Sequence, residues 1–160
     1  MTEQTPEQPA NEQKSPEFII QRIYLKDLSF ESPKSSEIFH EEWKPNIELA
    51  LKTNTRLMAA DIHEVVLCVT VTAKLDGEVA FLIEVQQAGV FLLKHFTPNN
   101  LRHMLGSYCP TILFPYAREA VSDLAMRGNF PPLALAPVDF DALYAQYVQK
   151  QQAEQAAKPL

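Results

Sequence analysis

The sequence predicts an α+β protein in which an antiparallel β-sheet is followed by helices. The first half of the chain carries segments in which apolar residues recur with period two. Asp76-Gly77 separates two of these segments, as in a tight hairpin. Helix-start signals at Thr97-Pro98 and Asp139 lie in the second half. This order of strands and then helices, without strand–helix–strand alternation, does not favour a doubly wound nucleotide-binding sheet.

The first two predicted strands are residues 18–30 and 47–57. Strict alternation would give the first strand two faces, Ile19, Ile23 and Leu25 against Ile20, Tyr24 and Leu28. Neither face is purely polar, so we expect both to contact protein. Residues 32–45 connect the two strands, and a connection of this length is unusual unless it has a role.

The clearest strand signal is the pair of segments 63–75 and 78–91 around Asp76-Gly77, which predicts a β-hairpin. In its first arm one face carries Val65, Leu67, Val69 and Val71. In its second arm the two faces are Val79, Phe81, Ile83 and Val85 against Ala80, Leu82, Glu84 and Gln86.

Helical signals begin at Thr97, a capping side chain followed by proline in the first turn. We expect a helix over 99–105 that ends at Gly106. Pro110 and Pro115 are expected to interrupt the chain after this glycine, because proline disfavours helix at the residue before it.

A second helix is predicted over 116–127, with Gly128 as its C-cap. Residues 130–137 carry three prolines and are expected to be irregular. Asp139 is predicted to cap a last helix that runs through about Gln149. The domain prediction is therefore a polar tail over 1–16, one folded domain over 17–149 and a flexible C-terminal tail over 150–160.

Composition excludes several classes of protein. The chain has 160 residues, a formal net charge of -6 and a sequence pI of about 5.2. This charge does not suit a nucleic-acid binder or a protein that lies on anionic lipid, whereas basic protein partners would be attracted. No signal peptide or apolar run of membrane-span length occurs, so we expect a soluble intracellular protein.

The sequence contains little that suggests catalysis. Its four glycines form no phosphate-binding motif, and GxSxG is missing. The two cysteines and four histidines have no metal-ligand spacing, so we predict no metal and no cofactor. Cys109 with His103 could serve a small enzyme, but a buried thiol is the simpler interpretation. A surplus of apolar strand residues instead indicates oligomerisation, ligand grooves or both, and an adaptor for one folded partner is a further alternative.

Five blocks of the sequence resemble the bacterial export chaperone family SecB: QRIYLKDLSFE, HEVVLCVTVTAKL, AFLIEVQQAGVF, LRHMLGSYCPTILFPYARE and NFPPLALAPVDFDALY. The resemblance covers residues 18–147. It implies a bacterial cytoplasmic chaperone with a four-stranded antiparallel sheet, a long crossover loop and C-terminal helices. Such proteins assemble as a homotetramer, a dimer of dimers. They bind unfolded secretory precursors without nucleotide or enzymatic activity, and they deliver them to the export ATPase SecA.

The resemblance also implies three sets of functional residues. SecA binding is expected at Asp27, Glu31, Leu82 and Glu84. An oligomer interface is expected near Phe81, Ile83 and Val85. An apolar groove for the unfolded client is expected at Trp43, Ile47, Leu49, Leu51, Phe140, Leu143 and Tyr144.

Overall fold

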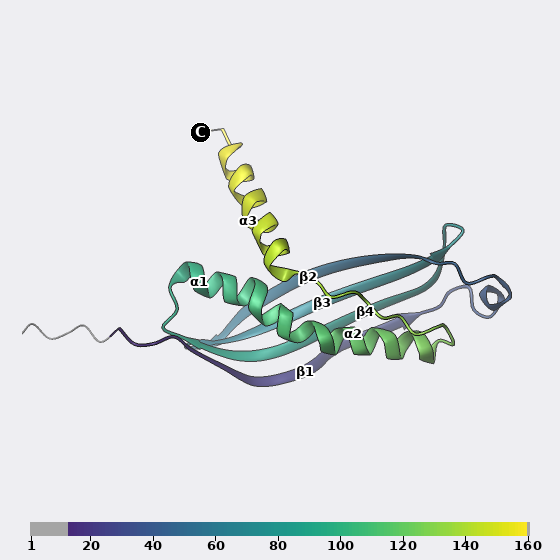
Figure 1. Ribbon diagram of the computed structural model, residues 1–160, viewed down its shortest axis with the longest axis horizontal. Coiled ribbons are helices and arrows are strands. Elements are labelled where there is room, and N and C mark those ends of the chain that lie inside the picture. The colour runs from purple at the N-terminus through teal and green to yellow at the C-terminus, as the bar shows by residue number, and fades with distance from the viewer. Residues whose placement is uncertain (1–12, 160) are drawn as a thin grey trace, which may run out of the picture.

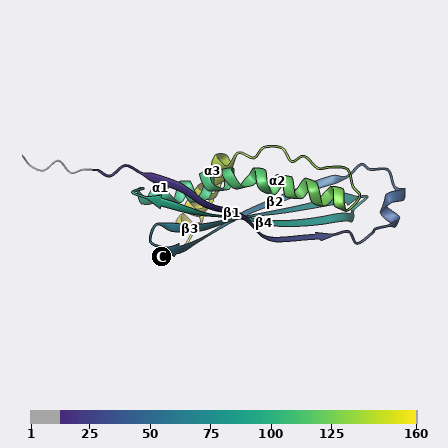
Figure 2. The same ribbon diagram turned by 90° about the horizontal axis from the view of Figure 1, so that it is seen from below.

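The computed structural model describes residues 13–159, which form one antiparallel sheet with helices on one of its faces (Figures 1 and 2). The strand order is β1-β4-β3-β2, so β1 and β2 are the two edges of the sheet. The predicted α+β class and the four-stranded antiparallel sheet are therefore confirmed. The strands are β1 Glu17–Glu31, β2 Asn46–Ala59, β3 Ile62–Leu75 and β4 Glu78–Lys94.

The helical part of the chain begins after β4, and a short 3₁₀ turn, η1 (Glu37–His40), lies in the connection between β1 and β2. In Figure 1 the longest helix lies along the sheet, whereas the last helix leaves the body of the molecule beside β2. The helical elements are α1 Pro98–His103, a π-helical turn η2 Met104–Tyr108, α2 Cys109–Arg127 and α3 Phe140–Ala156.

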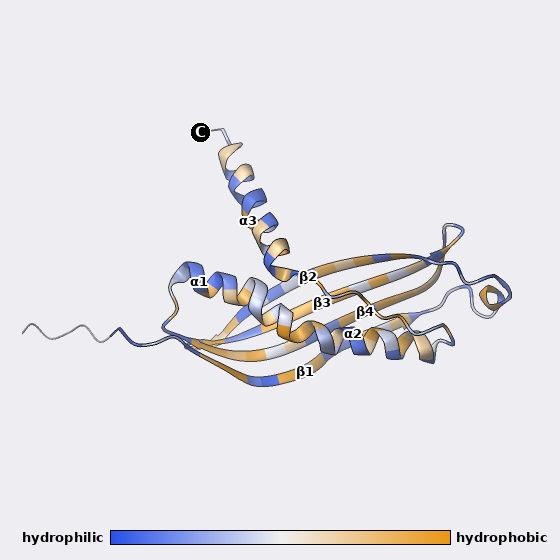
Figure 3. Cartoon of the chain, viewed as in Figure 1, coloured by the Kyte–Doolittle hydropathy of each residue, from blue (hydrophilic) through white to orange (hydrophobic). Residues whose placement is uncertain are grey.

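The hydrophobic core lies between the sheet and α2. The alternation predicted for the central hairpin is observed, because the side chains of one parity are fully buried there. We call this side the helix face and the opposite side of the sheet the open face. Figure 3 shows the apolar residues that run along the strands. Core residues on the helix face include Leu67, Val69, Val71, Phe81, Ile83 and Val85, packed with Leu113, Ala117 and Val121 of α2.

The predicted faces of β1 were wrong, because two bulges change its parity. Register shifts occur between Ile20 and Arg22 and between Leu25 and Asp27. Each bulge inserts one unpaired residue, and the side chains beyond it change face. The helix face of β1 therefore carries Ile20, Ile23, Leu25 and Leu28 together, and the open face carries Ile19, Arg22, Tyr24, Asp27, Ser29 and Glu31.

The hairpin between β3 and β4 confirms the Asp-Gly prediction. Asp76 and Gly77 both have positive φ, 49° and 80°. Two successive residues with positive φ match the right-handed twist of the strands on either side, which is why Asp-Gly is favoured at such turns.

The predicted helix break between Gly106 and Pro115 was wrong, because the helix is continuous from Pro98 to Arg127. Thr97 caps it as predicted, its side chain accepting a hydrogen bond from the Asn100 amide. The π-helical turn η2 inserts one extra residue, so the Cys109 amide donates to the Met104 carbonyl. Tertiary packing on the sheet outweighs the local preferences of glycine and proline here.

The end of α2 matches the prediction in part. Gly128 is the C-cap, but Asn129 is the residue with positive φ, at 65°. The Phe130 amide donates to the Ala125 carbonyl and closes the turn. Residues 131–139 have no regular structure, as predicted. Asp139 caps α3 through the Ala142 amide (3.0 Å), and this helix continues to Ala156, beyond the predicted end.

The polar tail that was predicted over 1–16 lies mostly outside the described residues. The sequence also predicted that no segment spans a membrane. Within residues 13–159 we find no helix that combines the length and the apolarity needed to cross a bilayer.

Candidate functional site

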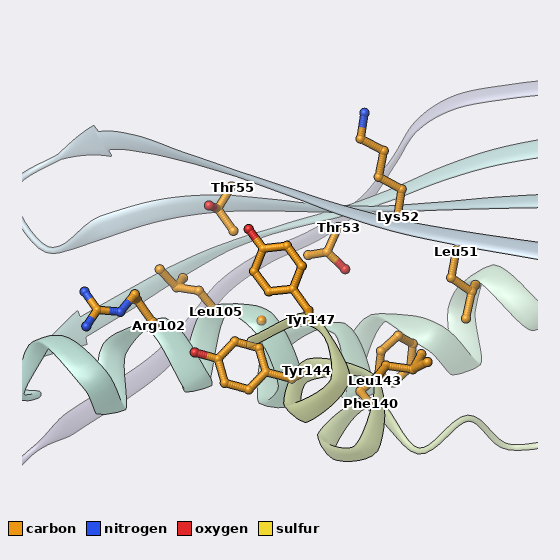
Figure 4. Close-up of a pocket in the computed structure, with 11 residues that line it drawn as sticks. Leu51, Lys52, Thr53, Thr55, Arg102, Leu105, Phe140, Leu143, Tyr144 and Tyr147 are labelled. Atoms are coloured by element: carbon orange, nitrogen blue, oxygen red, sulfur yellow. The ribbon is translucent and has the colours of Figure 1, made fainter. Parts of the chain in front are cut away.

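An apolar pocket of about 600 Å³ lies between the helix face of β2 and the first turns of α3 (Figure 4). The π-helical turn η2 closes it on a third side. In Figure 4 the ring of Tyr147 extends from α3 towards the strands, the ring of Tyr144 lies by the helical turn that carries Gly106, and Lys52 points away from the pocket. The lining residues are Leu51, Lys52, Thr53, Thr55, Arg102, Leu105, Gly106, Phe140, Leu143, Tyr144 and Tyr147.

The chemistry of the pocket suits an extended polypeptide. Leu51, Leu105 and Leu143 supply apolar surface, whereas the hydroxyl groups of Thr53 and Tyr147 can bond to backbone groups. Along the β2 edge of the sheet no other strand within residues 13–159 is paired. A segment that presents apolar side chains and free backbone groups together would find a partner for both.

The structure brings together four of the seven predicted groove residues. Leu51, Phe140, Leu143 and Tyr144 line the pocket. Ile47 and Leu49 have the same parity as Leu51, so they lie further along β2 on the helix face. Trp43 does not line the pocket. Tyr147 was not predicted, although its helical spacing from Tyr144 placed both on one face of α3, and Leu105 and Gly106 were not predicted because a helix break was expected there.

Trp43 belongs to a separate aromatic cluster at the other end of the helix face. Its ring centroid lies 6.1 Å from that of Phe81 and 5.2 Å from that of Phe130. Phe39 also packs on Phe130, at 5.4 Å, and its side chain is exposed. This cluster closes the end of the core under the 32–45 connection and extends the apolar surface of the helix face.

The four residues predicted to contact SecA lie together on the open face. Glu31 pairs with Leu82 across β1 and β4, and the next pair on this face is Ser29 with Glu84. Asp27 comes next, opposite Gln86. Directly paired residues of an antiparallel sheet project to the same side, so three carboxylates surround Leu82 and Ser29. We call Asp27, Glu31, Leu82 and Glu84 the acidic patch.

No side-chain cation among residues 13–159 pairs with the acidic patch. None of the ion pairs between residues 13–159 involves Asp27, Glu31 or Glu84. Lys26 is adjacent in sequence, but it occupies the bulge and its Nζ lies 2.9 Å from Oε1 of Glu64. The patch therefore presents uncompensated negative charge around an apolar side chain, an arrangement that attracts a basic partner.

Glu64 is the centre of a second polar cluster on the open face. Its side chain is 8% exposed and accepts hydrogen bonds from Tyr24, Lys26 and Arg56. The bond from Tyr24, followed by that from Lys26, holds the pKa of Glu64 below its ordinary value. Burial, together with the same bond, raises the pKa of Tyr24 to about 12. The cluster links both edge strands to β3.

The three predicted interface residues are in the protomer core. Phe81, Ile83 and Val85 are 1%, 0% and 1% exposed, and their side chains lie on the face that packs against α2. Side chains with so little exposed surface do not reach a second copy of this fold. An interface near these residues stays a prediction, in which they could influence the contact only through the elements that they support.

A different surface is available for contact between subunits. The edge strand β1 exposes four large apolar side chains, and a cavity of about 570 Å³ separates its middle from α2. Tyr116 of α2 lines this cavity and is 47% exposed. The exposed apolar residues of β1 are Ile19, Ile20, Leu25 and Leu28.

The geometry around Cys109 does not support a nucleophile. Cys109 has no exposed surface, and burial raises the pKa of its thiol to about 12, so the thiol is protonated at neutral pH. His103 instead places Nε2 2.8 Å from Oδ1 of Asp141. No cluster of three or more His, Cys, Asp and Glu side chains among residues 13–159 is arranged to hold a metal ion.

Comparisons with known proteins found matches in sequence and in fold. The family model for preprotein translocase subunit SecB matches residues 11–151. Relatives named protein-export protein SecB from Pseudomonas paraeruginosa and Pseudomonas aeruginosa are each 57% identical over 155 residues, which cover 96% of this chain and 94% of the relative. A Mycobacterium tuberculosis SecB-like chaperone, solved in complex with a ChAD peptide from an antitoxin, has a similar fold. Its TM-score is 0.61 at 20% identity, over 76% of this chain and 87% of the other.

Proposed function

Because this chain belongs to the SecB family of export proteins, we propose that it holds unfolded secretory precursors and delivers them to the SecA ATPase. The observation that carries the proposal is the apolar pocket beside the free edge of β2. Folded partners keep their apolar side chains and backbone groups internally paired, whereas an unfolded chain offers both. The pocket provides complementary groups for each.

Holding an unfolded client requires no chemical reaction, only binding. Burial of apolar client side chains yields about 25 cal/mol per Å², and several pockets on one oligomer would increase avidity through linked binding. The remaining predicted groove residues, Ile47, Leu49 and Trp43, extend the apolar surface along the helix face beyond the pocket. A surface of this length would accept many client sequences. We propose that the protein acts without nucleotide or cofactor, has no enzymatic activity and works in the bacterial cytoplasm.

Light scattering of a slow-folding secretory precursor, diluted from denaturant without nucleotide, tests this proposal. We expect suppression of aggregation near one oligomer per precursor. Leu143→Asp should weaken suppression, because it places a carboxylate in the pocket from a side chain that is 41% exposed and therefore tolerates substitution. A several-fold higher protein concentration should then be needed, consistent with a loss of about 1–2 kcal/mol.

Gln146→Asp is the matched control, because it adds the same charge to an exposed position of α3 that does not line the pocket. Circular dichroism would verify that both variants keep the fold. If the wild-type protein fails to suppress aggregation, the proposed holding function is wrong. If Leu143→Asp and Gln146→Asp behave alike, holding stands but the pocket is not the client site.

We further propose that the acidic patch docks a basic segment of SecA. Support comes from three carboxylates without cation partners around Leu82, on a face that the helices leave open. Because the pocket is on the helix face and the patch on the open face, SecA could dock while the client is still held. SecA would then compete for the client without hydrolysis by the chaperone.

We also propose that the protein is a homotetramer, a dimer of dimers, with β1 at one subunit contact. This placement is supported by the exposed apolar residues of β1, by its outer edge, which is unpaired within the described part of the chain, and by the cavity beside Tyr116. Phe81, Ile83 and Val85 would act beneath this surface by fixing the packing of β4, to which β1 is bonded.

A further inference from the structure

The wall of the pocket formed by α3 is attached to the rest of the protein at one end. Phe140 is the one buried residue of this helix, and Leu143 and Tyr147 are 41% and 59% exposed. The main neighbour of α3 in the fold is the π-helical turn η2. Residues 131–139, which precede α3, have no regular structure. The distance between α3 and β2 is therefore set by how the first turn of α3 sits on η2.

Asp141 makes the polar part of this attachment. Its Oδ1 accepts hydrogen bonds from the hydroxyl of Ser107 and from Nε2 of His103, the latter at 2.8 Å. The bond from Ser107, followed by that from His103, lowers the pKa of Asp141, so the carboxylate is ionised at neutral pH. Ser107 is 2% exposed, and a buried hydroxyl without a partner is costly. The attachment therefore consists of more than an exposed ion pair.

Tyr144 makes the apolar part, on the same face of α3 as Asp141. Its ring lies so close to Gly106 that a Cβ atom there would be 2.6 Å from Cδ2 of the ring. The His103 ring meets Tyr144 edge-on, with centroids 5.4 Å apart. Residues three apart on a helix lie side by side, so Asp141 and Tyr144 hold α3 against η2 as one unit.

We propose that Asp141 is a positioning residue that fixes α3 at the distance from β2 at which the pocket can take a client. This inference rests on the proposed function, because it assigns a determinant of client affinity. Asp141 itself does not line the pocket. Without its two hydrogen bonds, α3 would occupy the binding-competent position for a smaller fraction of the time. The apparent affinity falls in proportion to that fraction.

The test combines hydrogen–deuterium exchange with client binding in the full-length protein. For Asp141→Ala we expect amide exchange in residues 140–148 to become faster by about three- to tenfold. The dissociation constant for dye-labelled, reduced and carboxymethylated α-lactalbumin, measured by anisotropy, should rise as the binding-competent fraction falls, and by no more than the factor by which exchange increases. Asp141→Asn keeps an acceptor oxygen for Ser107 and should restore most of both properties.

Glu154→Ala is the matched control. It removes one carboxylate from the exposed part of α3, where Glu154 has no ion pair or side-chain hydrogen bond with any residue of 13–159. Equal exchange in Asp141→Ala and Glu154→Ala would overturn the proposal, as would faster exchange with unchanged client affinity. A loss of affinity that Asp141→Asn does not restore would also overturn it. If wild type binds no unfolded client but exchange responds as expected, the proposed function fails while the attachment of α3 stands.

Discussion

Glu64 shows how a single buried carboxylate can link the two edges of the sheet. Three donors from β1 and β2 converge on it, and its side chain is 8% exposed. Because these bonds lower its pKa in the folded protein, the ionised form stabilises the fold. This contribution is complete at pH values above the ordinary pKa of 4.5 and is lost as the pH falls below that value.

We therefore expect Glu64→Gln to lower the free energy of unfolding by about 1–3 kcal/mol at pH 7, because Lys26 and Arg56 lose their counter-charge. The difference from wild type should be smaller at pH 3, because the unfolded chain then binds a proton at Glu64 and the advantage of the ionised form decreases as the pH falls below 4.5. Urea unfolding at both pH values and one fixed protein concentration measures this. Glu48→Gln removes an exposed pair with Lys74 (3.2 Å) and should change stability by less than about 0.5 kcal/mol. Equal effects of the two substitutions would show that the buried Glu64 contributes no more to stability than an exposed ion pair.

At the scale of elements, the acidic patch depends on the register between β1 and β4. No bulge lies between Asp27 and Glu31, so alternation places both on the open face, and the β1–β4 register puts Ser29 opposite Glu84 there. The bulge between Leu25 and Asp27 leaves Lys26 unpaired, and its side chain contacts Glu64 instead of the patch. A patch built in this way has unopposed negative charge, so its interaction with a basic partner should be strong at low salt and weaken as salt is added.

We expect Glu84→Lys to weaken SecA binding by about tenfold or more, because it reverses one of three carboxylates at the centre of the patch. Client holding should be retained, since Glu84 faces away from the pocket. Glu48→Lys makes the same change of charge on the open face of β2 and should leave SecA affinity within about twofold. Calorimetric titration with SecA measures both variants. Unchanged affinity for Glu84→Lys would remove the patch assignment.

The elements that the sequence predicted well are those with local causes. The β3–β4 hairpin results from Asp76-Gly77, and the start of α1 results from the Thr97 cap. The faces of β1 were mispredicted because a bulge leaves no clear mark in a sequence of mixed polarity. The break expected at Gly106 did not occur, because that glycine makes room for Tyr144, a residue 38 positions later in the sequence.

The same distinction between local patterns and contacts of distant residues explains which residues of the pocket could be predicted. Leu51, Phe140, Leu143 and Tyr144 could be predicted because a family resemblance added long-range information to local patterns. Trp43 was assigned to the same groove, but contacts between residues distant in sequence place it in another cluster. Phe81 was expected near a subunit contact, whereas its pairing parity turns it into the core.

For the whole molecule, the decisive question is what covers the apolar edge at β1. Leu25 is 49% exposed, lines the cavity beside α2 and belongs to a strand whose outer edge pairs with no other strand of residues 13–159. Three of the four large apolar side chains that β1 exposes, Ile20, Leu25 and Leu28, share its helix face, and exposed apolar patches of this kind mark interaction sites. A second copy related by a two-fold axis would bury this surface twice, once from each subunit.

We therefore expect Leu25→Glu to shift the protein towards smaller species in sedimentation velocity, because each two-fold contact loses two apolar side chains and gains two charges. With about 2 kcal/mol per buried leucine, association should weaken by about a hundredfold or more. Leu57→Glu is the matched control, since Leu57 is 64% exposed but lies at the end of the opposite edge strand. If Leu25→Glu keeps the wild-type distribution while Leu57→Glu dissociates the oligomer, the subunit contact lies at β2 and would compete with the client for the pocket.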